Sequence, residues 1–289
     1  MNENNLGYLK KTLEGLGFGT KLNEVLENAI RREMPNFSLG ITTRQKPLEN
    51  SDRNAAKTEH LIFKFNFNRS KDSDMYFLNN YHVALHQKGN PIVRQQTFDL
   101  ERDYRITALQ AYKLLSGLSF EKEVYLRNKT AEGREPGRPQ EKTSLWFKLN
   151  LDITDAYGNH PLRTFRPEYG YDIREALSKY PLKGLSTAEK IEEGVKALSN
   201  GNYFQDNLQI GKKNLPVSIA ANPQMKTINI YDKDMVEIRD EVIFPEKARA
   251  KTTVSQPSPA QDRAASQAVQ PEQPWVQEPE LETGNKRGR

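Results

Sequence analysis

Apolar and polar residues alternate along the stretch from His60 to Gln87, and this pattern organises the rest of the chain. The large apolar side chains recur at every second position, at Leu61, Phe63, Phe65, Phe67, Tyr81, Val83 and Leu85. A period of two places such side chains on one face of a pleated strand. The polar segment RSKDSD between the two runs can form a turn. The pattern therefore predicts an antiparallel hairpin with one apolar face that other elements must cover.

Further strands and helices are expected on both sides of this hairpin. Phe37 to Ile41 begins a first strand at the edge, and Val93 to Leu100 returns as another, which gives an antiparallel meander. The covering helix is predicted from Thr107 to Ser116, because Thr107 and Gln110 match a capping box. Its apolar stripe is expected to consist of Leu109, Tyr112, Leu115 and Leu118.

The residues before the sheet predict a helical hairpin over 5–34. Its turn contains Gly15, Gly17 and Gly19, and Thr20 is expected to cap the second helix. Alternate glycines also occur in dinucleotide-binding loops, but those loops follow a strand. No strand is predicted before Gly15, so we interpret these glycines as a helix stop and a tight turn.

The second half of the chain alternates between short strands and helices. Strands are predicted at 123–127, 143–153 and 162–165, and the loop 128–142 between the first two is rich in Gly and Pro. Two helices follow, capped by Asp172 with Glu175 and by Ser186 with Glu189. Three short strands near 203–210, 215–221 and 227–231 complete a helix-helix-sheet unit.

The predicted fold class is α+β in four parts. These are a helical hairpin at 1–34, an antiparallel β-sheet domain with one covering helix at 35–168, a helix-helix-β unit at 169–244, and a Pro/Gln/Ala-rich tail at 245–289. The tail has almost no large apolar residues, so we expect it to be disordered. Trp275 is its bulky exception, either a docking motif or an isolated aromatic residue.

Composition narrows the choice of function. The absence of cysteine excludes disulfides, thiolate nucleophiles and iron–sulfur clusters. The 43 basic and 38 acidic residues give a net charge of +5, a mild bias that permits contact with a polyanion but is also typical of a mixed, solvated surface. No apolar run approaches the ~20 residues that span a bilayer, and the first residues lack the pattern of a signal peptide. We therefore expect a cytoplasmic protein that does not contact membranes.

No catalytic or metal-binding constellation emerges from the sequence. His82 and His86 are four residues apart, but on a strand their side chains lie ~13 Å apart, too far for one metal. The acidic pairs fall in predicted turns, at Asp72 and Asp74, Asp152 and Asp155, and Asp232 and Asp234. Phosphate-loop and nucleophile-elbow motifs are absent. The prediction is a protein that is not an enzyme and has no cofactor; a cleft that gathers Asp, Glu and His side chains would favour a divergent enzyme instead.

The best binding candidate is the run HPLRTFRPEYGYDIR at His160 to Arg174. Cationic side chains suited to phosphate contacts and ring faces suited to unpaired bases alternate in it, at Arg163, Arg166, Tyr169, Tyr171 and Arg174. Arg134 and Arg138 in the preceding loop add positive charge. The structural alternative is that Phe165 and Tyr171 belong to the core and that the arginines pair with Glu168 and Glu175.

Several segments resemble a family of uncharacterised cytosolic proteins carried on bacterial conjugative transposons. They are LGFG at 16–19, DMYFLNNY at 74–81, TF at 97–98, AYKLLSG at 111–117, EYGYD at 168–172, EALSKYPLK at 175–183 and ANPQMKTINIYD at 221–232. Residues 172–232 also look like a repeated module of unknown function in mobile-element proteins, some of them associated with topoisomerases that pass single strands. The resemblance implies a DNA-processing context and supplies no catalytic residue, while the loop 130–140 and the tail look peculiar to this chain.

These observations lead to two hypotheses. The first is a non-enzymatic accessory protein of a conjugative mobile element that binds nucleic acid or a DNA-processing partner such as a topoisomerase. The alternative is a protein-interaction module, for example an antagonist of a host factor, in which a sheet edge or the tail docks a partner without nucleic acid. The sequence leaves the oligomeric state open.

Overall fold

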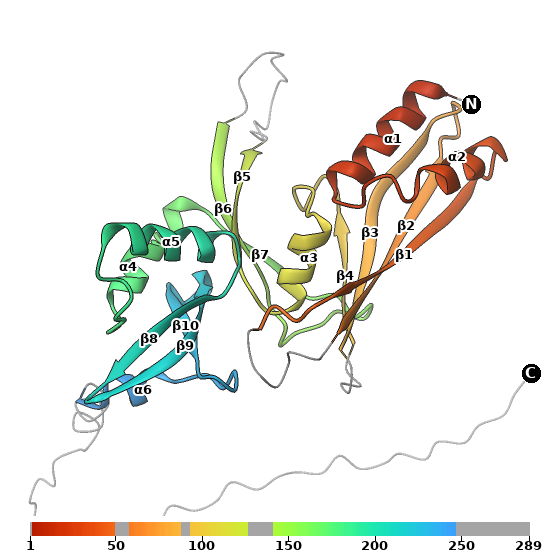
Figure 1. Ribbon diagram of the computed structural model, residues 1–289. Helices are drawn as coiled ribbons and strands as arrows, with labels where there is room; N and C mark the ends of the chain where they lie inside the picture. Colours follow the sequence, from red (N-terminus) through yellow and green to blue (C-terminus); the bar gives the residue numbers. More distant parts are fainter. Residues whose placement is uncertain (1, 50–57, 88–92, 127–140, 247–289) are drawn as a thin grey trace, which may run out of the picture. The chain divides into compact units, whose positions relative to one another are not determined.

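A computed structural model describes residues 2–49, 58–87, 93–126 and 141–246 (Figure 1). The chain divides into two compact units, Met1–Pro245 and Glu246–Arg289, and the account below concerns the first. Residues 247–289 of the predicted tail, which include Trp275, and the loop arginines Arg134 and Arg138 lie outside the described residues. The fold is α+β, as the sequence predicts.

Helices and antiparallel sheets follow one another along the first unit. The helices are α1 (Glu3–Gly15), α2 (Asn23–Arg31), α3 (Ala108–Leu115), α4 (Ile173–Ser178), α5 (Ala188–Ser199) and α6 (Asp240–Ile243), with short 3-10 turns η1 (Pro167–Tyr169) and η2 (Pro223–Met225). The first sheet contains β1 (Asn36–Gln45), β2 (Glu59–Arg69), β3 (Tyr76–Gln87) and β4 (Arg94–Asp99), in that order. The middle sheet contains β5 (Phe120–Leu126), β6 (Glu141–Leu149) and β7 (Leu162–Phe165), and the third contains β8 (Phe204–Ile210), β9 (Lys213–Asn222) and β10 (Thr227–Tyr231), in the order β10-β9-β8.

The hairpin predicted from the alternating pattern is confirmed as β2 and β3. Phe63 pairs with Val83 and Phe65 with Tyr81, and a register shift follows before Phe67. The apolar side chains of both strands are buried, while Ile62 on the other face is 43% exposed. The period of two therefore identified both the strands and their buried face.

The apolar face of the first sheet is covered by α1, α2 and α3, which lie over it in Figure 1. Phe18, in the turn after α1, meets Phe63 and Phe65 edge-on, with ring centroids 4.9 and 4.7 Å apart. Both bonds of the predicted capping box are present at the start of α3, where Thr107 and Gln110 cap each other's backbone N–H groups. The helical hairpin and the sheet thus share one hydrophobic core.

The structure corrects the expected stripe of α3 and the expected length of the strand at 143–153. Leu109 is 55% exposed, because α3 buries the side that carries Ala111, Leu114 and Leu115. β6 ends at Leu149 because Asn150 turns the chain, and Ile153 beyond this turn is exposed.

Two predicted helix caps were also wrong. α2 begins at Asn23 after Leu22, because Thr20 is part of the preceding turn, in which its carbonyl accepts from the N–H of Asn23. α5 is capped by Thr187, whose hydroxyl accepts from Lys190 N–H, one residue after the expected Ser186. Two adjacent hydroxyl residues allow either start, so the sequence alone does not decide between them.

The middle sheet has a hydrophobic core on each face. On β6, Leu145, Phe147 and Leu149 belong to the first core, whereas Trp146 between them belongs to the second. The second core is completed by α4, α5 and the third sheet, and Phe165 of β7 packs against it. Because successive side chains of β6 point to opposite faces, the middle sheet contributes to both hydrophobic cores.

Three of the outer strands, β4, β8 and β10, are covered by short segments of chain. The exposed side of β4 receives Asn159, whose side-chain oxygen accepts from Thr97 N–H at 2.8 Å. Pro181 and Lys183 bond to the backbone of β8, and Ile238 bonds to β10 at 2.7 Å. Within the described ranges, the backbone of β1 bonds to β2 alone.

No helix in the described part of the chain is both long and apolar enough to cross a membrane.

Candidate functional site

A polar cleft of about 670 Å³ lies beside the end of β4. The strand, the turn before α3 and the loop before β7 all contribute to its wall, which includes Thr97, Asp99, Asp103, Asp155, Asn159 and His160. The sequence did not predict that these acids and this imidazole would meet. Because such a gathering is what the enzyme hypothesis requires, the bonds of each group decide what the cleft can do.

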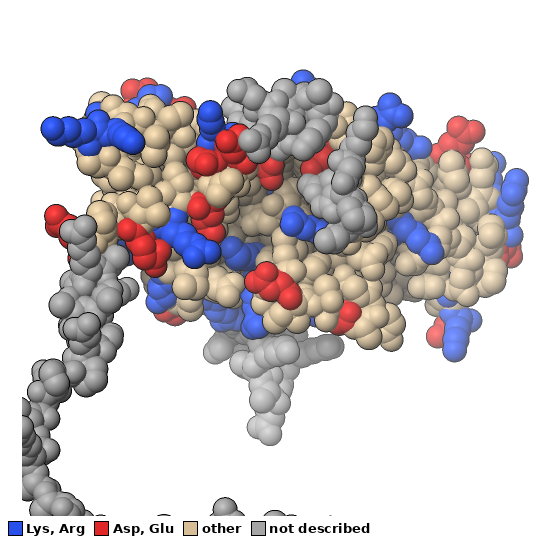
Figure 2. Space-filling model, turned by 90° about the horizontal axis from the view of Figure 1, so that it is seen from below, with Lys and Arg blue, Asp and Glu red and all other residues tan. Residues whose placement is uncertain are grey.

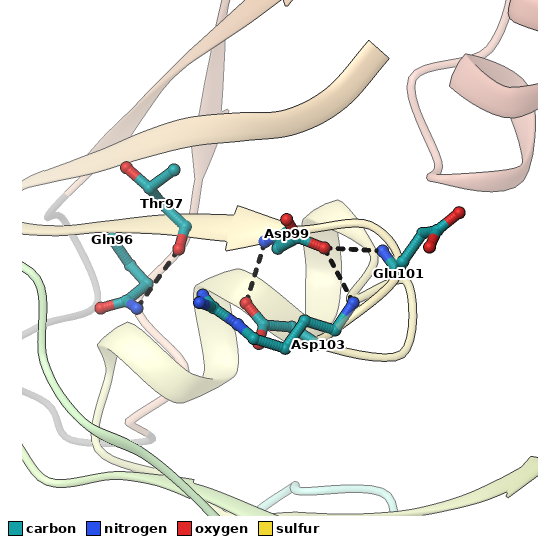
Figure 3. A network of polar contacts seen from close by, with 6 residues as sticks. Gln96, Thr97, Asp99, Glu101 and Asp103 are labelled. Carbon is teal, nitrogen blue, oxygen red and sulfur yellow. Dashed lines mark hydrogen bonds and ion pairs between the residues drawn. The ribbon is translucent and has the colours of Figure 1, made fainter. Parts of the chain in front are cut away.

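The carboxylates of Asp99 and Asp103 hold the turn between β4 and α3 (Figure 3). Asp99 Oδ1 accepts from the backbone N–H groups of Glu101 and Arg102 at 2.9 and 2.8 Å. Asp103 Oδ2 accepts from Asp99 N–H at 2.9 Å, and its other oxygen accepts from Arg102 Nε at 3.1 Å. These bonds replace missing backbone partners in a tight turn.

Asp155 and His160 hold the opposite wall of the cleft. The backbone and side-chain N–H groups of Asn159 donate to Asp155 and lower the pKa of its carboxyl, with a further bond from Tyr157 N–H at 2.8 Å. His160 Nδ1 lies 2.9 Å from the carbonyl of Ile153, so this nitrogen carries the proton. The acids and the imidazole are bound to nearby backbone, and among the described residues no group of His, Asp and Glu could hold a metal ion. We therefore assign no reaction to the cleft.

Asp155→Ala is expected to lower the free energy of unfolding at neutral pH, because the loop loses its central acceptor. The native pKa lies below the ordinary value of about 3.9, so this stabilisation is present above that pH and disappears as the pH falls through the native pKa. Urea unfolding at neutral and acidic pH measures the difference from the unsubstituted protein, which should shrink in acid. Asp152→Ala is the control, since no described hydrogen bond reaches that carboxylate; equal effects of both substitutions at all pH values would contradict the prediction.

The predicted nucleic-acid residues fall into two groups. Arg163 lies on β7 opposite Lys148 of β6, Arg166 directly precedes η1, and Tyr169 ends η1 with 39% of its surface exposed. Both arginines are exposed. These three exposed residues follow one another along the segment that runs from β7 into η1.

Tyr171 packs against the second core, and the exposed Arg174 forms an ion pair. Tyr171 packs edge-on against Trp146 with ring centroids 5.0 Å apart, its hydroxyl donates to the carbonyl of Thr227, and burial raises its pKa. Arg174 forms an ion pair with Glu192 of α5. The structural alternative was right that Phe165 and Tyr171 pack against the core, but Glu175 pairs with Lys179 rather than with an arginine.

Lys226 approaches Tyr169 from the end of η2, a contact that the sequence did not reveal. Its Nζ lies 4.4 Å from the centroid of the Tyr169 ring, and the Tyr169 hydroxyl donates to the carbonyl of Gln224 at 2.8 Å. Lys226 has a left-handed backbone with φ of 52°, so the turn holds it in a conformation that side-chain-bearing residues seldom adopt. The strands predicted at 215–221 and 227–231 imply a connection between them, but only packing shows that this connection faces Tyr169.

We call Arg163, Arg166, Tyr169 and Lys226 the basic surface. Within the described part of the chain, none of its three cations forms an ion pair with a carboxylate. Beside it, Lys148 Nζ donates to Asn222 at 3.3 Å, and burial lowers the pKa of this lysine. On the face drawn in Figure 2, acidic and basic side chains are interspersed, so the positive charge is local rather than general.

Comparisons with protein-family models, curated proteins and solved structures returned no match to this chain.

Proposed function

We propose that the protein is a non-enzymatic accessory protein that binds single-stranded nucleic acid at the basic surface. One observation carries the proposal: Lys226 lies over the exposed ring of Tyr169, Arg163 and Arg166 are exposed on the segment that leads to this tyrosine, and none of the three cations forms an ion pair with a described carboxylate. Unpaired cations on a surface are available to phosphate oxygens, and this is the main source of affinity for nucleic acid.

Tyr169 favours unpaired bases over a duplex. Its ring is held by Phe165 at a centroid distance of 5.1 Å and by the hydrogen bond to Gln224, so little side-chain entropy remains to be lost on stacking. Lys226 Nζ lies over the ring and would move to a phosphate when a base stacks there. The arginines on β7 and before η1 would then follow the backbone of the strand.

The proposed setting is the cytoplasm of a bacterium that carries a conjugative mobile element. The support for it is the set of segments that resemble conjugative-transposon proteins, including the segment at 221–232 that contains Lys226. In this setting the protein would hold a strand beside a DNA-processing partner such as a topoisomerase. It would contribute binding and no cofactor or catalytic group.

The triple variant R163A/R166A/K226A tests the proposal. Fluorescence anisotropy with a labelled single-stranded oligonucleotide at several salt concentrations gives the slope of log K against log salt. Each lost phosphate contact on a single strand removes about 0.7 from this slope, so the variant should reduce the slope by about 2 and weaken binding most at low salt.

A matched control removes three cations that are already neutralised. R31A/K142A/K190A breaks the ion pairs with Glu27, Glu123 and Glu193 and changes the net charge by the same amount. Binding should be nearly unchanged in this variant. No binding by the unsubstituted protein at low salt, or equal losses in both triple variants, would refute the proposed function.

The protein-interaction alternative is favoured by a different feature: within the described ranges, the backbone of the edge strand β1 bonds to β2 alone.

A further inference from the structure

β1 is the longest edge strand of the described sheets. β4, β8 and β10 each receive hydrogen bonds from a neighbouring loop or segment, whereas within the described ranges the backbone of β5 bonds to β6 alone and the strand carries three charged residues. β1 is ten residues long, and in the described ranges its outer N–H and C=O groups meet no other backbone. An uncovered edge of this length is a template for another strand.

The side chains of β1 do little to block such pairing. Proteins commonly protect an edge with proline, a bulge or charged residues. β1 has an uninterrupted register with β2, contains no proline, and carries its single charge at Arg44 near the end. Its centre is Gly40, flanked on the outer face by Ser38 and Thr42.

We propose that the edge of β1 pairs with the β1 edge of a second copy of this chain, antiparallel about a two-fold axis at Gly40. In a continuous antiparallel sheet, residues that lie directly opposite each other point to the same face. Two symmetric copies of β1 meet this condition only when the two-fold axis passes through a residue rather than between two residues. Centring on Gly40 pairs the whole span 36–44 and extends the first sheet into a continuous sheet across both subunits.

The charges and polar groups of β1 fit this register. Arg44 lies opposite the partner's Asn36, and Ser38 lies opposite the partner's Thr42, so no like charges meet along the strand. A register centred on Leu39 leaves Arg44 beyond the paired span, and one centred on Ile41 leaves Asn36 beyond it.

The apolar face of β1 supports the same arrangement. An apolar groove of about 320 Å³ lies beside β1, lined in part by Ile41 and Thr43 and by the exposed Leu109 of α3. In the proposed register the partner's Leu39 and Phe37 stand opposite Ile41 and Thr43. The groove then borders the junction of the two subunits.

Charge substitutions at Ser38 and Thr42 test the proposal in the full chain. Sedimentation velocity and light scattering of the unsubstituted protein should give twice the chain mass of 33.2 kDa, with dissociation on dilution. S38K/T42K and S38E/T42E each place two like-charged pairs across the axis, which should raise the dissociation constant of the dimer by on the order of tenfold.

Mixing provides the decisive comparison. S38K/T42K combined with S38E/T42E should form a heterodimer, and S38K/T42E should remain a homodimer, because opposite charges then face each other. Circular dichroism and the melting temperature verify that each variant folds. A monomeric unsubstituted protein, or a dimer that none of these substitutions changes, would overturn the proposal, and neither outcome bears on nucleic-acid binding at the basic surface.

Discussion

Phe65→Ala is expected to lower the free energy of unfolding by about 3–5 kcal/mol, the range for removing a large aromatic side chain from a closed core. Phe65 is fully buried on β2 and lies between Phe18, 4.7 Å away by ring centroid, and Tyr81, 5.9 Å away. The turn after α1 and the neighbouring strand both contact this ring, so neither can move in to fill the space without losing its own contacts.

Ile62, on the opposite face of the same strand, supplies the control for Phe65. Ile62→Ala removes an apolar side chain of the same strand that is 43% exposed, so its loss should be well below that of Phe65→Ala. Urea unfolding followed by circular dichroism gives both values. Similar losses for the two variants would mean that the apolar row of β2 is not the centre of the core.

Trp146→Ala is expected to have the second large effect, again about 3–5 kcal/mol. Trp146 is buried on β6 and faces the second core, where its ring meets Tyr171 edge-on at 5.0 Å. Its removal leaves a cavity between the middle sheet and the residues that lead into α4. The measurement is again urea unfolding, with Tyr125→Ala on β5 as the control, because Tyr125 is 58% exposed.

A double-mutant cycle with Tyr171 makes this second prediction specific. Trp146→Ala and Tyr171→Ala should be less destabilising together than the sum of the single effects, by about 0.5–1.5 kcal/mol for an aromatic pair. Strict additivity would show that the two rings do not stabilise each other.

The sequence was most informative where one physical signal dominates. Strict alternation defined β2 and β3 with the correct buried face, and the capping box defined the start of α3. Leu109 was misassigned because a helix of two turns has an ambiguous apolar side, and only its neighbours decide which side is buried.

The candidate site was less accessible to sequence reasoning, because its members come from distant segments. Arg163, Arg166 and Tyr169 are close in sequence and were found together, whereas Lys226 reaches Tyr169 only through the packing of η2. Tyr171 and Arg174 have the right chemistry but are used in the core and in an ion pair. The polar cleft was missed for the same reason, since Asp99 and Asp155 are brought together by a loop that covers β4.

The middle sheet makes the two halves of the first unit inseparable. A fragment that stops after β7 would leave Trp146 and Phe165 facing solvent. A fragment that begins at α4 would lack the face of the middle sheet that completes the second core. Neither fragment should be soluble by itself, so a shortened version for biophysical work has to retain everything from α1 to α6.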